Sequence, residues 1–170
     1  MNRPEIHEFD PYYNTYVSLI EGDNVLEQLD AQPPELRAMF EHVPDDRVNH
    51  SYAEGKWTIK ELLCHLIDGE RIFAYRVLRI SRGDETPIEG FEQNGYIENS
   101  NANNRSFSDL LDEFELQRRA NMNMLRNLSD DAARRIGTAS EKTISVRALV
   151  YIMAGHVRHH INILHERYLP

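Results

Sequence analysis

The stretch from Ser145 to Tyr168 limits most strongly what this chain can fold into. Read at 3.6 residues per turn, it places its apolar side chains on one stripe, which predicts an amphipathic helix. His156 and His160 fall on the same apolar stripe. A buried imidazole must satisfy two ring nitrogens, and a spacing of four residues stacks two rings on one face. The pattern is typical of a helix that holds a metal ion.

Two histidines do not complete a metal site. Zn²⁺ and its neighbours in the first transition row need at least three protein ligands, with one position left for water or substrate. His65 is the candidate for the third ligand, because it faces inward on a helix predicted from Thr58 to Arg82. Spacing alone does not decide whether the two helices bring His65, His156 and His160 together.

His159 is a rival to His160, since it lies three residues after His156. Adjacent residues point about 100° apart on a helix, so His159 and His160 are not expected to share one ion. We prefer His160, which lies in line with the apolar stripe. The other histidines are interpreted as surface residues: His7, His42, His50 and His165.

The structural alternative for these histidines is that they are core residues. A single inward-facing imidazole is more often hydrogen-bonded to a carbonyl group than bound to a metal. This interpretation has more weight for His65 alone than for the pair His156 and His160. Metal, if bound, would then only tie two helices together.

Four long helical segments are expected along the chain. After a short helix between Asp10 and Gly22, a second run extends to Val43, and we expect prolines to split it, with a restart near Pro34. A loop covers residues 44–56. The clearest helix begins at a capping box formed by Thr58 and Glu61 and ends before a glycine.

The second half of the chain begins with a long connection over residues 84–105. A third long helix starts at Ser106 or Ser108 and reaches Leu128, and one or two further turns stop at Gly137. Thr143 or Ser145 then caps the last helix. No segment predicts a strand, so the expected fold is all-α: a four-helix bundle with one long crossover, in a single domain over residues 1–170.

Composition excludes several classes of partner. The formal net charge is −9, whereas nucleic-acid backbones and anionic membranes select for basic surfaces. No apolar run approaches about 18 residues, so no membrane span is expected. Cys64 is the one cysteine and cannot form an internal disulfide, and the chain begins with no signal-like segment. We therefore expect a cytoplasmic protein.

Other polar residues near the predicted stripes have two interpretations. Asp68 follows His65 by three residues and could orient its ring, although an exposed carboxylate is commoner. Cys64 is expected to pack as a small apolar residue. Arginines near apolar stripes either pair with carboxylates, the commoner case, or bind an anionic substrate. These arginines are Arg76, Arg79 and Arg118.

Two motifs together resemble the DinB-like (damage-inducible) family. The first runs from Trp57 to Asp68, with the pattern W-[ST]-x-x-E-x-x-x-H-L, and the second contains His156, His159 and His160 near the C-terminus. The resemblance covers nearly the whole chain. It implies a four-helix bundle, commonly dimeric, in which His65, His156 and His160 hold a divalent metal.

The resemblance also limits the reaction. The family includes transferases of low-molecular-weight thiols and mycothiol-dependent maleylpyruvate isomerases. We expect a metal-dependent enzyme in which a divalent ion, zinc or nickel, activates water or a thiol against a small electrophile, as a hydrolase or a thiol transferase. The alternative is a non-catalytic dimeric bundle with a structural or vestigial metal site.

Some parts of the expected site are less defined. No catalytic side chain is assigned, and no motif for a serine hydrolase, an NTPase or a dinucleotide site is present. The long connection is expected to form a pocket wall through Phe91, Asn94 and Tyr96. A homodimer contact is expected on the first helix, at Tyr12, Tyr13 and Tyr16.

Overall fold

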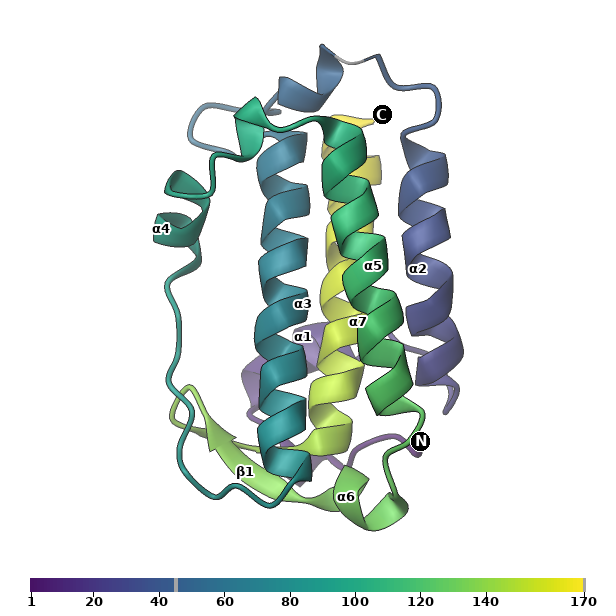
Figure 1. Cartoon of the computed structure of the whole chain (residues 1–170), viewed down its shortest axis with the longest axis vertical. Helices are drawn as coiled ribbons and strands as arrows, with labels where there is room; N and C mark the ends of the chain where they lie inside the picture. Colours follow the sequence, from purple (N-terminus) through teal and green to yellow (C-terminus); the bar gives the residue numbers. More distant parts are fainter. Residues whose placement is uncertain (45, 170) are drawn as a thin grey trace.

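Four long helices form the body of the computed structural model, which describes residues 1–44 and 46–169 (Figure 1). They are α2 (Val25–Met39), α3 (Ile59–Ser81), α5 (Phe107–Leu125) and α7 (Val146–Ile163). Helices α2 and α7 run in one direction and α3 and α5 in the other (Figure 1). Both α3 and α2 pack against α5 and α7. The predicted four-helix bundle is confirmed.

Side-chain caps begin three of these helices, as the sequence predicts. The Thr58 hydroxyl accepts from Glu61 N–H at 3.1 Å, while the Glu61 carboxylate accepts from Thr58 N–H at 2.8 Å. Ser106 caps α5 and Ser145 caps α7, each through its hydroxyl oxygen. These contacts satisfy backbone donors that have no partner inside the helix. The alternative caps lie inside elements instead: Ser108 in α5 and Thr143 in a strand.

The predicted break of the second helix near Pro34 is wrong, because α2 continues through Pro33 and Pro34. A proline inside a helix lacks the N–H that would bond the carbonyl four residues earlier. For Pro33 this is the carbonyl of Leu29, and Arg118 Nη1 on α5 donates to it at 2.7 Å. A side chain from another helix thus replaces the missing hydrogen bond, a partner that the local sequence does not reveal.

The expectation of no strand is also wrong. Strands β1 (Ile136–Ala139) and β2 (Lys142–Ser145) form an antiparallel hairpin at one end of the bundle (Figure 1). The two residues between them, Ser140 and Glu141, have φ values of 51° and 63°. Hairpin turns with positive φ at both positions favour Asn-Gly or Asp-Gly, so the Ser-Glu pair is not a recognisable hairpin signal.

Shorter elements cover the bundle. They are η1 (Ile6–Glu8), η2 (Pro11–Tyr13), α1 (Asn14–Val17), η3 (Arg47–Asn49), α4 (Gln93–Glu98), η4 (Ala102–Asn104), α6 (Asp130–Arg134) and the π-helical turn η5 (Leu164–Tyr168). The connection that carries α4 runs along the outside of the bundle beside α3 (Figure 1). No helix in the described ranges is long and apolar enough to cross a lipid bilayer.

Helix α1 packs directly on α7, where Gly155 allows a close approach. A Cβ atom at Gly155 would lie 2.1 Å from the carbonyl oxygen of Tyr16. Any larger residue at this position would push α1 away. The glycine beside His156 therefore fixes the N-terminal segment against the helix that carries two histidines.

The two large clusters of the apolar core lie on the same four helices. One cluster takes residues up to Ala154 from α7 and from Phe73 onward from α3, and the other begins at Val157 on α7 and ends at Ile67 on α3. Between them lies a band of polar side chains at the middle of the helices. Its buried members are Gln32, His65, Glu70, Arg118 and His156.

Arg118 connects the four helices through this band. Its Nε and Nη2 donate to the two carboxylate oxygens of Glu70 on α3, both at 2.8 Å. Its Nη1 donates to Leu29 O at 2.7 Å and to Gln32 Oε1 at 2.9 Å, both on α2. Gln32 Nε2 in turn donates to Ala154 O on α7 at 2.7 Å. The side chains of Arg118 and Glu70 are each 1% exposed.

We expect Arg118→Met to lower the free energy of unfolding by about 3–5 kcal/mol, because it leaves the carboxylate of Glu70 buried without its partner. It also removes the donor to Leu29 O. Equilibrium unfolding in urea measures the loss.

The matched control is Arg126→Met at the end of α5, whose ion pair with Asp30 is about half exposed on both sides. Exposed pairs contribute less than about 1 kcal/mol. Equal losses for the two variants would contradict the role given to Arg118.

Candidate metal centre

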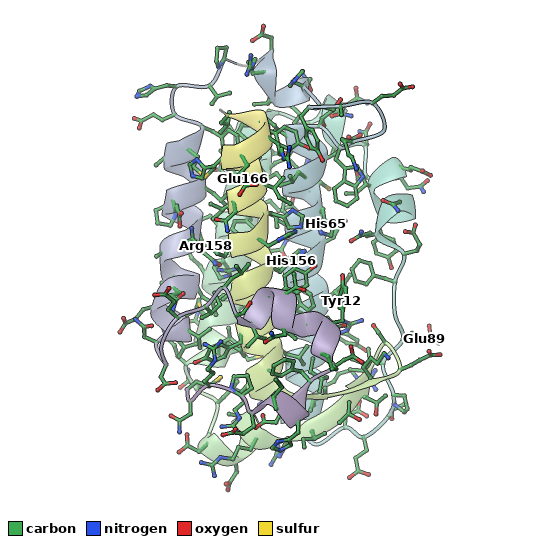
Figure 2. All side chains as sticks on the ribbon, turned by 180° about the vertical axis from the view of Figure 1, so that it is seen from behind. Tyr12, His65, Glu89, His156, Arg158 and Glu166 are labelled. Carbon is green, nitrogen blue, oxygen red and sulfur yellow. The ribbon has the colours of Figure 1, made fainter. Side chains whose placement is uncertain are left out.

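The structure brings His65, His156 and His160 together between α3 and α7. One ring nitrogen from each lies within 4.8 Å of the others. The Nε2 atoms of His65 and His156 are 2.9 Å apart, and Figure 2 shows these two side chains pointing toward one another. The two inward stripes predicted from the sequence thus meet across the helix pair.

Aromatic side chains surround the cluster. The ring of Trp57 lies 4.8 Å from that of His65. Phe73 and Tyr16 pack edge-on against His156 at 5.6 and 5.5 Å. His65 and His156 are 4% and 6% exposed, whereas His160 is half-buried. The rings are therefore held in a largely apolar environment that disfavours charge.

Burial keeps the three histidines neutral. Together with the nearby His159, it lowers the pKa of His65 to about 4. Burial, followed by repulsion from the neighbouring imidazoles, lowers the pKa of His156 and of His160 well below the ordinary value. Neutral imidazole is the form that binds a metal. At neutral pH each imidazole therefore has a nitrogen lone pair available for a metal and need not first release a proton to solvent.

The unsatisfied ring nitrogens fit a metal ion better than a hydrogen-bonded core. Between the two Nε2 atoms of His65 and His156, only one proton can be shared. Nδ1 of His160 is buried and has no hydrogen-bond partner in the described ranges. Such groups are costly when nothing pairs with them. Three imidazoles suit zinc, nickel and related ions, and leave a coordination position open for chemistry.

Gly69 makes room for the ring of His156. It lies one turn after His65 on α3, and a Cβ atom there would lie 3.1 Å from Cε1 and 3.3 Å from Nδ1 of His156. Both distances are tighter than ordinary van der Waals contacts. The small residue thus sets how closely α7 places its histidine against α3.

His159 lies outside the cluster. Its half-buried ring packs edge-on against Tyr16 at 5.6 Å. The structure therefore brings His160, and not His159, to His65 and His156, as the stripe position predicts. The other four histidines are exposed, also as predicted: His7, His42, His50 and His165.

The two polar neighbours of His65 have structural roles. The Asp68 carboxylate lies 3.7 Å from Arg71 and makes no hydrogen bond to a histidine among the described residues. Cys64 is buried against Ile97 and Ala102, and burial raises the pKa of its thiol. Its packing as a small apolar residue is confirmed.

Two cavities reach the histidines from different sides. One of about 400 Å³ is lined by His65 and His156 together with Tyr12, Tyr13, Tyr16, Phe73, Arg76, Phe91 and Ser140, among others. The other, of about 230 Å³, is lined by His160, Trp57 and Asn94 among others. Tyr96 lines a neighbouring cavity of about 530 Å³. The long connection therefore contributes walls to the histidine cavities through Phe91 and Asn94, as predicted, whereas Tyr96 lines only the neighbouring cavity.

Tyr16 and Ser140 are site residues that the sequence did not reveal as such. Tyr16 was expected at a dimer contact, but it packs on His156 and lines the larger cavity. Its spacing of four from Tyr12 is the one local signal, since it places both rings on one helical face. Ser140 reaches the cavity because the unrecognised hairpin carries it there.

Comparisons with known proteins agree with this arrangement. A sequence model of the DinB superfamily matches residues 28–164. Among solved structures, YfiT from Bacillus subtilis is similar in fold, with a TM-score of 0.77 at 18% sequence identity, over 90% of this chain and 95% of that one. YfiT is described as a probable metal-dependent hydrolase with an unusual four-helix bundle topology. No curated protein matches the chain.

We expect the purified protein to hold about one divalent metal ion per chain, because three neutral imidazoles converge at one point between α3 and α7. His65→Ala, His156→Ala and His160→Ala should each lose the metal. Elemental mass spectrometry measures the content, and a chelator should lower the melting temperature of the wild-type protein alone.

The control for this measurement is His165→Ala, which removes an exposed histidine nine residues after His156. It should keep its metal. Metal retained in all three cluster variants would show that the ion binds elsewhere on the chain.

We expect Gly69→Ala to weaken zinc affinity by about tenfold, because its methyl group displaces the ring of His156. The substitution should not destabilise helix α3 itself, because alanine has a higher helix propensity than glycine. Competition with a zinc-binding dye measures the affinity. Gly95→Ala adds the same methyl group in α4, 3.4 Å from a side-chain oxygen of Glu92, and should change nothing. An unchanged affinity in Gly69→Ala would contradict the close fit.

Proposed function

The chain belongs to the DinB superfamily, and from this premise we propose that it is a metal-dependent hydrolase of a small molecule. In this proposal His65, His156 and His160 hold a divalent ion. The similarity in fold to YfiT, a probable metal-dependent hydrolase, supports the reaction class. The resemblance noted from the sequence supports the choice of ligands.

The observation that carries the proposal is that the histidine cluster opens into a cavity. A metal that only ties α3 to α7 needs no such space, but a reaction needs room for a substrate. The cavity of about 400 Å³ falls in the range of small-molecule sites, and aromatic rings line it, as is usual there. With three protein nitrogens, a position remains for water.

A divalent ion at such a site supplies a nucleophile near neutral pH, because it lowers the pKa of a bound water or thiol. The protein residues do the rest. Burial keeps all three histidines neutral, and the rings of Trp57 and Phe73 pack against His65 and His156. Burial and the neighbouring Tyr12 raise the pKa of Tyr16 well above its ordinary value. Its hydroxyl therefore stays protonated and can donate a hydrogen bond to a substrate in the cavity.

Thiol transfer is the main competing reaction. It uses the same ligands in the same way, and the family resemblance includes it. We favour hydrolysis because the described function of YfiT points to it. A structural role of the metal is the alternative that the melting temperature and turnover measurements address. The homodimer stays a prediction.

We expect the zinc-loaded or nickel-loaded protein to hydrolyse members of a panel of small esters, lactones, amides and phosphate esters. Turnover should disappear after chelation and in His156→Ala, because the nucleophile is lost. The exposed variant His165→Ala should keep it. Product formation measured by chromatography, with and without a low-molecular-weight thiol, checks the reaction.

Three outcomes separate the alternatives. Turnover that needs the thiol and gives a thioether product would replace hydrolysis by thiol transfer. No turnover, together with a melting temperature that falls strongly on chelation, would favour a structural metal. Equal turnover in His156→Ala would remove the histidine cluster from the reaction.

A further inference from the structure

Arg76 is a buried cation with no counter-ion. Its side chain belongs to a residue that is only 3% exposed, and it makes no ion pair within residues 1–44 and 46–169. Its hydrogen bonds come from Nη2, to the carbonyl of Glu89 at 3.2 Å and to the hydroxyl of Ser140 at 2.8 Å. Nε is buried and has no hydrogen-bond partner among the residues that the structure describes. A buried charge paired only with neutral groups is costly.

Other arginines near the core are compensated. Arg118 is bound by the Glu70 carboxylate at 2.8 Å, and Arg79, one turn from Arg76, pairs with Asp84 at 2.6 Å. These two confirm the structural ion pair expected from the sequence. Arg76 makes no such ion pair among the described residues. The other interpretation given by the sequence, binding of an anionic substrate, therefore applies to Arg76.

The carboxylates of Glu89 and Glu92, which are near Arg76 in space or along the cavity wall, form no ion pair with its guanidinium. Glu89 gives only its backbone carbonyl, and its side chain points away from the bundle (Figure 2). The carboxylate of Glu92 accepts the N–H groups of Asn94 and Gly95 at the start of α4. Burial lowers the pKa of Arg76, and the interaction of its side chain with Tyr13 raises that pKa in part. The guanidinium is thus an available donor in an environment that strengthens any bond to an anion.

Arg76 lines the same cavity as His65 and His156. Arg76 follows His65 by eleven residues on α3, which returns it to within about 20° of the same face and places it about 16 Å along the axis. Helical side chains lean toward the N-terminus, and the guanidinium lies over the ring of Phe73, 6.0 Å from its centre. Gly69 and Phe73, which lie between His65 and Arg76 on α3, also line the cavity.

Ser140 completes the arrangement. Its hydroxyl accepts from Arg76, and its own proton has no acceptor among the described residues. The residue has a φ of 51°, which is unfavourable for a side chain other than glycine. Strain of this kind persists where the surrounding structure requires it, and functional sites are common examples. The hairpin turn thus holds a hydroxyl donor beside the guanidinium.

We infer that Arg76, with Ser140, anchors the anionic end of the substrate, a carboxylate or a phosphate, while the remainder of the molecule reaches the histidine cluster. This rests on the proposed function for the reaction, although the anchor itself needs no metal. The substrate is then an elongated anion with an apolar or aromatic middle, since Tyr16, Phe73 and Phe91 line the path.

The test measures binding of three probes by calorimetry to the full-length protein freed of metal by chelation. Phenylacetate offers a carboxylate, phenyl phosphate a phosphate, and phenylacetamide a neutral group of the same shape. We expect at least one anionic probe to bind about tenfold more tightly than the amide, and the comparison of the two anions assigns the group. Equal binding of all three probes would overturn the inference.

Variants locate the anchor. Arg76→Gln should remove the preference for anions and keep the metal content of the wild-type protein. Arg76→Lys keeps the charge and should keep part of the preference, which retains the test if Arg76→Gln does not fold. Arg79→Gln, the matched control, changes an arginine already paired with Asp84 and should bind the probes unchanged. An anion preference that survives in Arg76→Gln would overturn the assignment.

This experiment can fail independently of the proposed function. If the protein hydrolyses neutral substrates and binds the probes equally, the anchor is wrong and the hydrolase stands. If the metal-free protein prefers anions through Arg76 but no substrate is turned over with metal, the anchor stands and the hydrolase does not.

Discussion

A buried ion pair determines how the four helices can be arranged. Arg118 and Glu70 are almost fully buried, so each charge must find its partner and the remaining donors must find acceptors. These requirements connect α5 to α3 directly, to α2 through Leu29 and Gln32, and to α7 through Ala154. Apolar packing alone tolerates small shifts along a helix axis, but a bidentate pair with a fixed set of acceptors does not. The network therefore sets the relative height of all four helices.

The histidine cluster depends on that alignment. Glu70 follows His65 by five residues on α3, and Ala154 precedes His156 by two on α7, so the network and the cluster fix neighbouring parts of the same two helices. Gly69 then lets the ring of His156 pack directly against the backbone of α3. A shift of one helix by a fraction of a turn would separate the ring nitrogens. Burying polar groups in the middle of the bundle costs free energy, but the resulting hydrogen-bond network holds the three histidines in fixed positions.

The sequence was sufficient for the parts that depend on local periodicity. The phase of two amphipathic stripes selected His65, His156 and His160 and favoured His160 over His159. Capping signals located one helix start at Thr58 and left two candidates for each of the others, of which the structure uses Ser106 and Ser145. The errors arose where a distant side chain decides the outcome. Proline at position 33 is tolerated because Arg118 replaces its hydrogen bond, and the Ser140–Glu141 turn forms although its residues disfavour it. Tyr16 reaches the cluster only because Gly155 lets α1 cross α7. Arg118 is 85 residues from Pro33 in the sequence, and Gly155 is 139 residues from Tyr16, so local patterns do not reveal either contact.

Arg76 and Arg118 show why the sequence could not separate a structural cation from an available one. Both lie near apolar stripes on long helices, and both are buried. The difference is the acceptor: Arg118 faces a carboxylate across the bundle, whereas Arg76 faces a carbonyl, a hydroxyl and a cavity. A fold that had only to be stable would place a carboxylate beside Arg76 or replace it by an apolar residue. Among the described residues no carboxylate pairs with this guanidinium, which shares a cavity with His65 and His156. An anion from outside the chain would complete the pair, and the free energy of that contact would then be available for binding substrate.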